Sequence, residues 1–254
     1  MKVDVYVLCY NESKLVPFAL DYWAKFATNV YILDNGSTDN TIELLKAESR
    51  FNIEIIPFDS NNELNDAIYL ELKNNIWKKS IGKCDFVVIS DFDEMVYSPD
   101  LQRELHFMLE NNQTICFPKI YEMVNEKYPE YNGSLLHEIV SGGITNQEFG
   151  KRILFNPNKI QEINYTAGCH TCNPIGEVNY YTGNDIYLFH FKFLSLEYVL
   201  KRHEEYNIRL SALNKEKGWG KHYTNKNKSK VKDTFKMLMK KKFNINERLK
   251  NGTL

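Results

Sequence analysis

The first 95 residues alternate strand-sized apolar segments with segments whose apolar side chains recur at helical spacing, and this alternation constrains the fold more than any other feature. In chain order, the expected strands and helices cover residues 3–9, 14–27, 30–33, 40–50, 53–57, 64–79 and 86–90. Ser13 is the expected N-cap of the first helix. Because strand–helix alternation builds βαβ units, the sequence predicts an α/β fold with a mostly parallel central sheet flanked by helices.

The second half of the chain is less regular. Its expected strands cover residues 114–118, 153–155 and 187–193. Ser195 is the expected N-cap of a helix that reaches about residue 213. No internal repeat or low-complexity linker precedes residue 221, so we expect one continuous domain over residues 1–220, followed by a tail over residues 221–254.

Three of the four expected strands in the first half end in polar clusters. Asn11-Glu12 follows the first strand, Asp34-Asn35-Gly36-Ser37 follows the second, and Asp91-Phe92-Asp93-Glu94 follows the fourth. Open parallel sheets bind ligands outside the carboxyl ends of their strands. We therefore expect these clusters to gather at one edge of the sheet, around a ligand.

Asp91 and Asp93 suggest a metal site within the third cluster. Residues two apart in extended backbone point the same way, so both carboxylates are expected on one side. Two like charges held close are costly unless a cation neutralises them, and Mg²⁺ and Mn²⁺ prefer carboxylate, water and phosphate oxygens. We favour a metal–diphosphate site over a loop whose acids are solvated or cap the next helix.

The charges exclude one class of protein and divide the chain. With 32 Lys and Arg against 33 Asp and Glu, the net charge of −1 does not indicate a nucleic-acid binder. Residues 221–254 hold ten lysines and one arginine against two acids, a net charge of +9, so residues 1–220 carry −10. Apolar residues between Val231 and Phe243 recur at helical spacing among the lysines. This basic amphipathic helix either binds an anionic membrane surface or packs its apolar side on the acidic body.

Topology and redox signals favour a cytoplasmic protein, free or held at the inner face of the membrane. No run of about 20 apolar residues is present, and the N-terminal apolar stretch ends at Asn11, which does not fit a signal peptide. The five cysteines are odd in number, and only Cys169 and Cys172 are close in sequence. We expect reduced thiols rather than a disulfide scaffold.

Three motifs at the strand ends resemble those of family 2-type glycosyltransferases, which have the GT-A fold. They are Val7-Leu8-Cys9-Tyr10-Asn11-Glu12, Ile32-Leu33-Asp34-Asn35-Gly36-Ser37-Thr38-Asp39-Asn40-Thr41 and Ile89-Ser90-Asp91-Phe92-Asp93-Glu94. The third is similar to the bacterial branch whose acidic motif reads Asp-x-Asp-Glu. Looser similarity, at residues 64–78 and 188–198, extends the resemblance to about residue 210.

The resemblance implies a GT-A nucleotide-diphospho-sugar transferase domain, with its nucleotide-binding half at about residues 1–110 and its acceptor half at about 111–220. The implied reaction moves a sugar from a nucleotide diphosphate sugar, first of all a UDP-sugar, to the hydroxyl of a glycan or lipid-linked acceptor. Inversion, Mn²⁺ or Mg²⁺, and a role in bacterial surface polysaccharide or lipopolysaccharide synthesis are the family expectations. The alternatives are a sugar-phosphate nucleotidyltransferase, which would usually show a Gly-rich basic loop that Tyr10-Asn11-Glu12-Ser13 lacks, and a non-catalytic nucleotide- or carbohydrate-binding module.

Carried over by position, the resemblance also implies roles for single residues. Those of the nucleotide and metal sites are Tyr10 beside the base, Glu12, Asp34 and Asn35 on base or ribose, Asp91 near ribose or metal, and Asp93 and His190 on the metal. His170 is a rival for His190. It lies in Cys169-His170-Thr171-Cys172, which would be a zinc site only if a second ligand pair were present.

The charge flow of such a reaction requires further groups. Cations must stabilise the leaving diphosphate, and the candidates are Lys73, Lys151 and Arg152. A carboxylate must take the proton of the acceptor hydroxyl. The candidates for this catalytic base are Asp185, Glu138 and Glu177, with Asp185 preferred because it lies a few residues before His190.

Overall fold

The computed structural model describes residues 1–145 and 151–254 of the chain. In these residues a six-stranded central sheet has the order β3-β2-β1-β4-β9-β6. Its strands are β1 Val3–Cys9, β2 Asn29–Asp34, β3 Asn52–Pro57, β4 Phe86–Asp91, β6 Ile115–Cys116 and β9 Leu154–Phe155. The first four are parallel, and β9 runs antiparallel to both β4 and β6. The expected α/β fold with a mostly parallel central sheet is confirmed.

A second sheet continues from the first. Its order is β5-β12-β7-β8, and its strands are β5 Glu94–Tyr97, β7 Lys119–Val124, β8 Ser141–Thr145 and β12 Tyr187–Phe193. β12 runs parallel to β7 and antiparallel to β5. Because β5 follows β4 after only Phe92 and Asp93, the acidic motif lies at the junction of the two sheets. A separate short pair joins β10 Ile160–Glu162 to β11 Ile175–Gly176.

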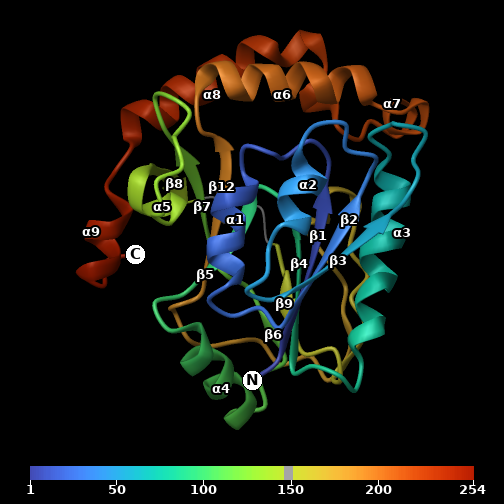
Figure 1. Cartoon of the computed structure of the whole chain (residues 1–254), viewed down its shortest axis with the longest axis vertical. Helices are drawn as coiled ribbons and strands as arrows, with labels where there is room; N and C mark the ends of the chain where they lie inside the picture. The colour runs from blue at the N-terminus through green and yellow to red at the C-terminus, as the bar shows by residue number, and fades with distance from the viewer. Residues whose placement is uncertain (146–150) are drawn as a thin grey trace.

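Helices cover the sheets and close one end of the molecule. They are α1 Val16–Trp23, α2 Thr41–Lys46, α3 Asp66–Asn75, α4 Leu101–Glu110, α5 Leu136–Ile139, α6 Leu196–Arg209, α7 Ala212–Lys217, α8 Lys228–Lys241 and α9 Ile245–Lys250, with 3₁₀ turns η1 Ile76–Ser80, η2 Ala167–Cys169, η3 Lys221–Tyr223 and η4 Asn225–Asn227. Figure 1 shows α6 and α8 lying across the end of the molecule toward which β1 and β2 point, and α4 at the opposite end.

Strand β1 explains why the first apolar segment is continuous rather than alternating. Val5 and Val7 pack into the core that contains α1, whereas Tyr6 between them packs into a second core with Trp77. A strand buried on both faces needs apolar side chains at successive positions.

The helix starts differ from the sequence prediction in one of two cases. Ser195 caps α6 as predicted, because its Oγ accepts the Tyr198 N–H at 3.1 Å. Ser13 does not cap α1, which begins after Leu15 with a proline in its first turn. The Ser13 N–H instead donates to Asp39 at 3.2 Å, so the residue belongs to the loop network. The helix expected to reach residue 213 is two helices, α6 and α7.

The basic tail packs on the rest of the chain. The predicted amphipathic helix forms as α8, which lies against α6, β7 and β8. Its Phe235 and Leu238 are buried with Val124 and Phe193, so the apolar side of the helix faces the second sheet. Within the described residues, no helix is long and apolar enough to cross a membrane.

Candidate active site

Strand register brings the polar clusters together. Leu8 on β1 is paired with Leu33 on β2 and with Asp91 on β4, and Cys9 is paired with Asp34. The residues that follow these positions therefore leave the sheet side by side. The expectation that the clusters share one edge is confirmed.

Strand β12 brings the second half of the chain to the same place. His190 is paired with Glu94 on β5 and with Glu122 on β7. The Phe191 N–H donates to the Asp93 carbonyl oxygen at 2.8 Å. The histidine therefore lies next to the acidic motif although about 100 residues separate them.

A central cavity of about 720 Å³ occupies this edge. The predicted site residues that line it are Tyr10, Glu12, Asn35, Lys73, Asp91, Asp93 and His190. Lys151 and His170 line it as well. Asp34, Glu138 and Asp185 are not in its lining.

Asp93, His190 and Glu122 form a chain of charged groups. His190 Nε2 lies 3.5 Å from Asp93 Oδ2, and His190 Nδ1 lies 3.0 Å from Glu122 Oε2. Burial alone would lower the pKa of His190, but Glu122 and Asp93 raise it well above its usual value. Burial raises and His190 lowers the pKa of Asp93, and the net effect is a lowered pKa. Without a bound cation, the group is an imidazolium between two carboxylates.

Asp91 and Asp93 both line the central cavity, but their carboxylates bind different partners. Strand β4 ends at Asp91 and the chain turns at Phe92 and Asp93 before β5 begins. Phe92 is buried in the core. The period-two rule holds only in a continuous strand, so the turn sends the two carboxylates to different neighbours.

Asp91 is held by two lysines. Lys73 Nζ lies 2.5 Å from Asp91 Oδ1, and Lys151 Nζ lies 3.2 Å from Asp91 Oδ2 and also contacts Glu94. Burial raises the pKa of Asp91, but the larger combined effect of Lys73 and Lys151 holds it well below its usual range. Because both Asp91 carboxylate oxygens form ion pairs with lysines, Asp91 is not one of the proposed metal ligands.

The residues expected to contact the nucleoside also interact with other side chains of the protein. The Arg209 guanidinium lies 3.2 Å from the centroid of the Tyr10 ring, the ring expected beside the base. Asn35 donates from Nδ2 to the Tyr69 hydroxyl at 2.7 Å and accepts at Oδ1 from the Ser60 hydroxyl at 2.8 Å. Asp34 accepts the hydroxyl and backbone N–H of Ser37, which places it in the turn below the cavity lining. Arg209, which the sequence prediction missed, therefore lies against the ring that is expected beside the base.

Glu12 forms an ion pair with Arg202 of α6. The same guanidinium donates to the Tyr10 and Asn11 carbonyl oxygens at 3.2 and 3.4 Å and to the Tyr206 hydroxyl at 2.6 Å. Arg202 thus fastens α6 to the loop that follows β1.

The structure does not bring the predicted catalytic bases to the cavity. Asp185 pairs with Arg103 at 3.2 Å, and Glu138 accepts the Leu135 N–H at 3.0 Å in α5. Asp185 was chosen for its closeness to His190 in sequence, but five residues of strand span about 17 Å. Glu177, the third candidate, pairs with the exposed Lys159.

The segment around Cys169 and Cys172 shows no zinc site. All five cysteines are free thiols, and Cys169 is buried beside Lys73. Burial and Lys151 lower the pKa of His170 to about 4, so this histidine is neutral at pH 7. Across residues 1–145 and 151–254, no group of three or more His, Cys, Asp or Glu side chains is arranged to hold a metal ion.

The donor set of Asp93 and His190 nevertheless fits a divalent cation that keeps most of its coordination for other ligands. Mg²⁺ and Mn²⁺ bind with one or two protein groups plus water and substrate phosphates, and imidazole and carboxylate both suit Mn²⁺. Glu122 contacts His190 Nδ1, the position from which carboxylates orient metal-binding histidines in other proteins.

Sequence reasoning missed the cavity residues of α6 and the lysine of β12, Lys192. Arg202, Tyr206 and Arg209 recur at positions i, i+4 and i+7, so they share one helix face, and all three line the cavity. Lys192 lies two residues after His190, on the same face of β12, and also lines it. The spacing of these residues is visible in the sequence, and it is the signal that could have predicted them as cavity residues.

The sequence matches the model of glycosyl transferase family 2 over residues 4–173. The chain belongs to this family. It is thus a member of a family of glycosyltransferases, and its fold is of the expected GT-A type. A search of curated proteins by sequence found no match.

The solved structures similar to the chain have low sequence identity to it and TM-scores below 0.5. TarS of S. aureus is 16% identical with a TM-score of 0.47 over 89% of this chain and 45% of that chain. TarS 1–349 in complex with UDP-GlcNAc is 15% identical with a TM-score of 0.45 over 89% and 74%. Glucosyl-3-phosphoglycerate synthase of Mycobacterium tuberculosis, in complex with Mn²⁺, UDP and glucosyl-3-phosphoglycerate, is 17% identical with a TM-score of 0.33 over 48% and 44%. This chain therefore spans less than half of the first TarS chain.

Proposed function

We propose that this chain transfers a sugar from a nucleotide diphosphate sugar to an acceptor hydroxyl, with Mn²⁺ or Mg²⁺ held by Asp93 and His190. The observation that carries the proposal is the meeting of these two residues, from opposite halves of the chain, in a cavity at the carboxyl ends of parallel strands. This is the edge at which an open α/β sheet binds nucleotides.

The chain's own residues prepare the site for the leaving diphosphate. Glu122 holds His190 Nδ1, which leaves Nε2 directed to Asp93. When bound, the cation supplies Lewis-acid stabilisation of the charge that develops on the diphosphate. Lys192, on the same wall, adds an ammonium that has no carboxylate at ion-pair distance within the described residues, whereas Lys73 and Lys151 are paired with Asp91 and Glu94.

The finer parts of the proposal concern the donor and the setting. Tyr10, Glu12, Asp34 and Asn35 are the proposed nucleoside contacts, with a UDP-sugar as the first donor to test and inversion as the expected stereochemical outcome. The proposed pathway is bacterial surface polysaccharide or lipopolysaccharide synthesis. Because the apolar side of α8 is buried, any contact with an anionic membrane surface would use its exposed lysines rather than insertion.

A panel of donors tests the proposed function. We expect the full chain to release nucleotide from one of UDP-, GDP-, dTDP- or CMP-sugars only when Mn²⁺ or Mg²⁺ is present. Asp93→Ala should abolish both this turnover and metal-dependent nucleotide binding, and Asp185→Ala, a matched acid outside the cavity, should leave both unchanged. Full metal-dependent turnover by Asp93→Ala would contradict the metal assignment, and donor binding without turnover would favour the non-catalytic module.

A further inference from the structure

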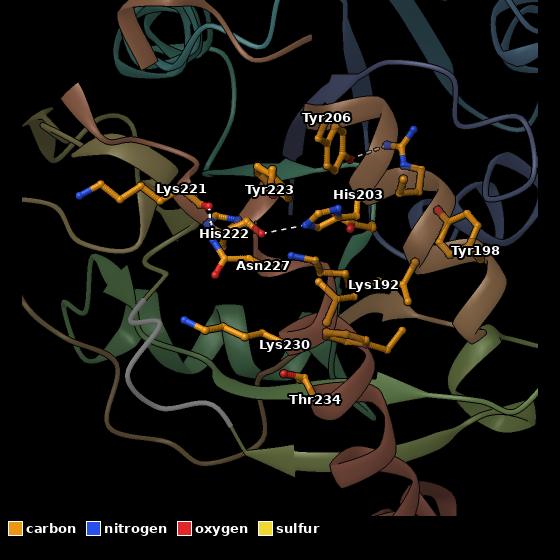
Figure 2. A pocket seen from close by; sticks show the side chains of 15 residues that line it. Lys192, Tyr198, His203, Tyr206, Lys221, His222, Tyr223, Asn227, Lys230 and Thr234 are labelled. Carbon is orange, nitrogen blue, oxygen red and sulfur yellow. Dashed lines mark hydrogen bonds between the residues drawn. The ribbon is translucent and has the colours of Figure 1, made fainter. Parts of the chain in front are cut away.

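A side pocket of about 350 Å³ opens beside the central cavity (Figure 2). It lies between β12, α6, η3 and α8, and it shares with the central cavity a wall that includes Asp93, Lys192 and Arg202. Its volume suits a small ligand such as one sugar with a substituent. A ligand in this side pocket lies directly beside the proposed metal site.

The lining of the side pocket carries surplus positive charge. Its cationic side chains are Lys192, Arg202, Lys221 and Lys230. Asp93 is the acid among the described lining residues, and it already pairs with His190, while Arg202 is neutralised by Glu12. Within the described part of the chain, none of the three lysines has a carboxylate at ion-pair distance.

Lys192 is the lysine at the junction of the two cavities. Its side chain is half-buried, and its ammonium lies 5.1 Å from the centroid of the Tyr223 ring. In Figure 2 the Lys192 ammonium lies among the labelled side chains of the side pocket, whereas Lys221 and Lys230 both extend to the left of the view, from η3 and α8. Glu122 and Asp93 lie near enough to favour this charge, but both already pair with His190. A bound anion would give the Lys192 ammonium a partner of its own.

The other walls suit a sugar rather than a bare ion. The rings of Tyr198, Tyr206 and Tyr223 and the side chain of Val199 line the side pocket. Apolar and aromatic walls with a few placed polar groups are typical of sites for small organic ligands.

We propose that the side pocket binds the acceptor, and that the acceptor carries an oxyanion, a phosphate or a carboxylate, on or beside the sugar that receives the transfer. This inference rests on the proposed function, because the shared wall with Asp93 is what makes the side pocket an acceptor site. Lys192 and Lys230 bind the oxyanion, and the tyrosines face the sugar.

Calorimetric titration of the full chain tests the inference. The chain is first saturated with UDP and Mn²⁺, and then titrated with glucose 6-phosphate, with glucuronate, and with glucose as the neutral control. We expect at least one charged sugar to bind and glucose not to bind, and the stronger of the two distinguishes a phosphate from a carboxylate acceptor. Lys192→Gln and Lys230→Gln should each weaken that binding about tenfold, the worth of one charge-assisted hydrogen bond. Lys232→Gln, on the exposed side of the same helix, should leave it unchanged.

The inference would be overturned if neither charged sugar binds, or if Lys232→Gln weakens binding as much as Lys192→Gln does. It would also be overturned if a charged sugar binds to the chain alone but not to the chain with UDP and Mn²⁺, which would assign Lys192 to the donor diphosphate. Thermal unfolding of each variant shows that it is folded. If none of UDP, GDP, dTDP and CMP binds together with Mn²⁺, the proposed function fails on its own. The same titration without nucleotide then decides whether the side pocket binds an oxyanion.

Discussion

Replacing Asp91 with asparagine should destabilise the fold more than replacing Asp93, although both belong to the acidic motif. Asp91→Asn removes the carboxylate that faces Lys73 and Lys151. Lys151 keeps Glu94, but Lys73, whose side chain is 5% exposed, is left without a carboxylate partner among the described residues. Asp93→Asn removes one neighbour of His190, which keeps Glu122 and is also able to lose its proton.

The magnitude follows from the ion-pair distances. At 2.5 and 3.2 Å, and with an effective dielectric constant of about 20, the two pairs are each worth roughly 5–7 kcal/mol before desolvation is subtracted. Measured losses on breaking a buried pair are about 3–5 kcal/mol. Because Asp91 is 33% exposed and Lys151 stays paired, we expect Asp91→Asn to lower the free energy of unfolding by about 3 kcal/mol, and Asp93→Asn by about 1 kcal/mol or less.

Urea unfolding followed by circular dichroism at pH 7 measures both values. Lys73 and Lys151 lower the pKa of Asp91, so the stability that Asp91 contributes is present above its unfolded pKa of about 4 and is lost as the pH falls below it. The difference between wild type and Asp91→Asn should therefore be full at pH 7 and shrink in acid. Equal losses for the two variants, or a difference that grows in acid, would refute the reasoning.

Three further predictions concern the histidine support and the tail. Glu122→Gln removes the carboxylate behind the imidazole, so it should weaken Mn²⁺ binding to the chain with UDP by about 10–100-fold, measured by calorimetry; an unchanged affinity would contradict the support role. Phe235→Ala should lower the free energy of unfolding by about 3 kcal/mol and Met237→Ala by less than about 0.5 kcal/mol, because Phe235 lies on the buried side of α8 and Met237 on its exposed side. Equal losses would show that α8 does not pack as described. If the exposed side of α8 contacts a membrane, replacing Lys232 and Lys236 with glutamine should weaken binding to vesicles with anionic lipid about fivefold per lysine. Vesicle binding that does not change with salt concentration would contradict an electrostatic contact.

The fold of residues 1–110 was accessible from the sequence because its signals are local. Tyr6 and its apolar neighbours on β1 follow the pattern of a strand buried on both faces, and the helical spacing between strands placed α1 to α3. The helix ends were less accessible. Ser13 has the right residue type for a cap, but the loop network with Asp39 uses its backbone instead.

The candidate site was only partly accessible. The direction of the strands predicted that Asp91 and Asp93 reach the sheet edge, and the structure brings His190 beside Asp93. The prediction that Asp185 lies near His190 was wrong because a strand is extended, so residues five apart in sequence lie far apart in space. The pocket lysine Lys192 and the α6 arginines were overlooked because only the packing of α6 and α8 over the cavity gives their periodicity a meaning.

The sequence by itself determined the parallel sheet, the polar clusters at its carboxyl edge and the amphipathic helix of the tail, since each depends on periodicity within a few residues. Only the tertiary structure decided which partner each charged group takes. Lys73 and Lys151 reach Asp91 from 18 and 60 residues away, and Glu122 reaches His190 from 68 residues away. Such pairs form where separate elements pack side by side, and electrostatic energy depends on that distance in space rather than on position in the chain.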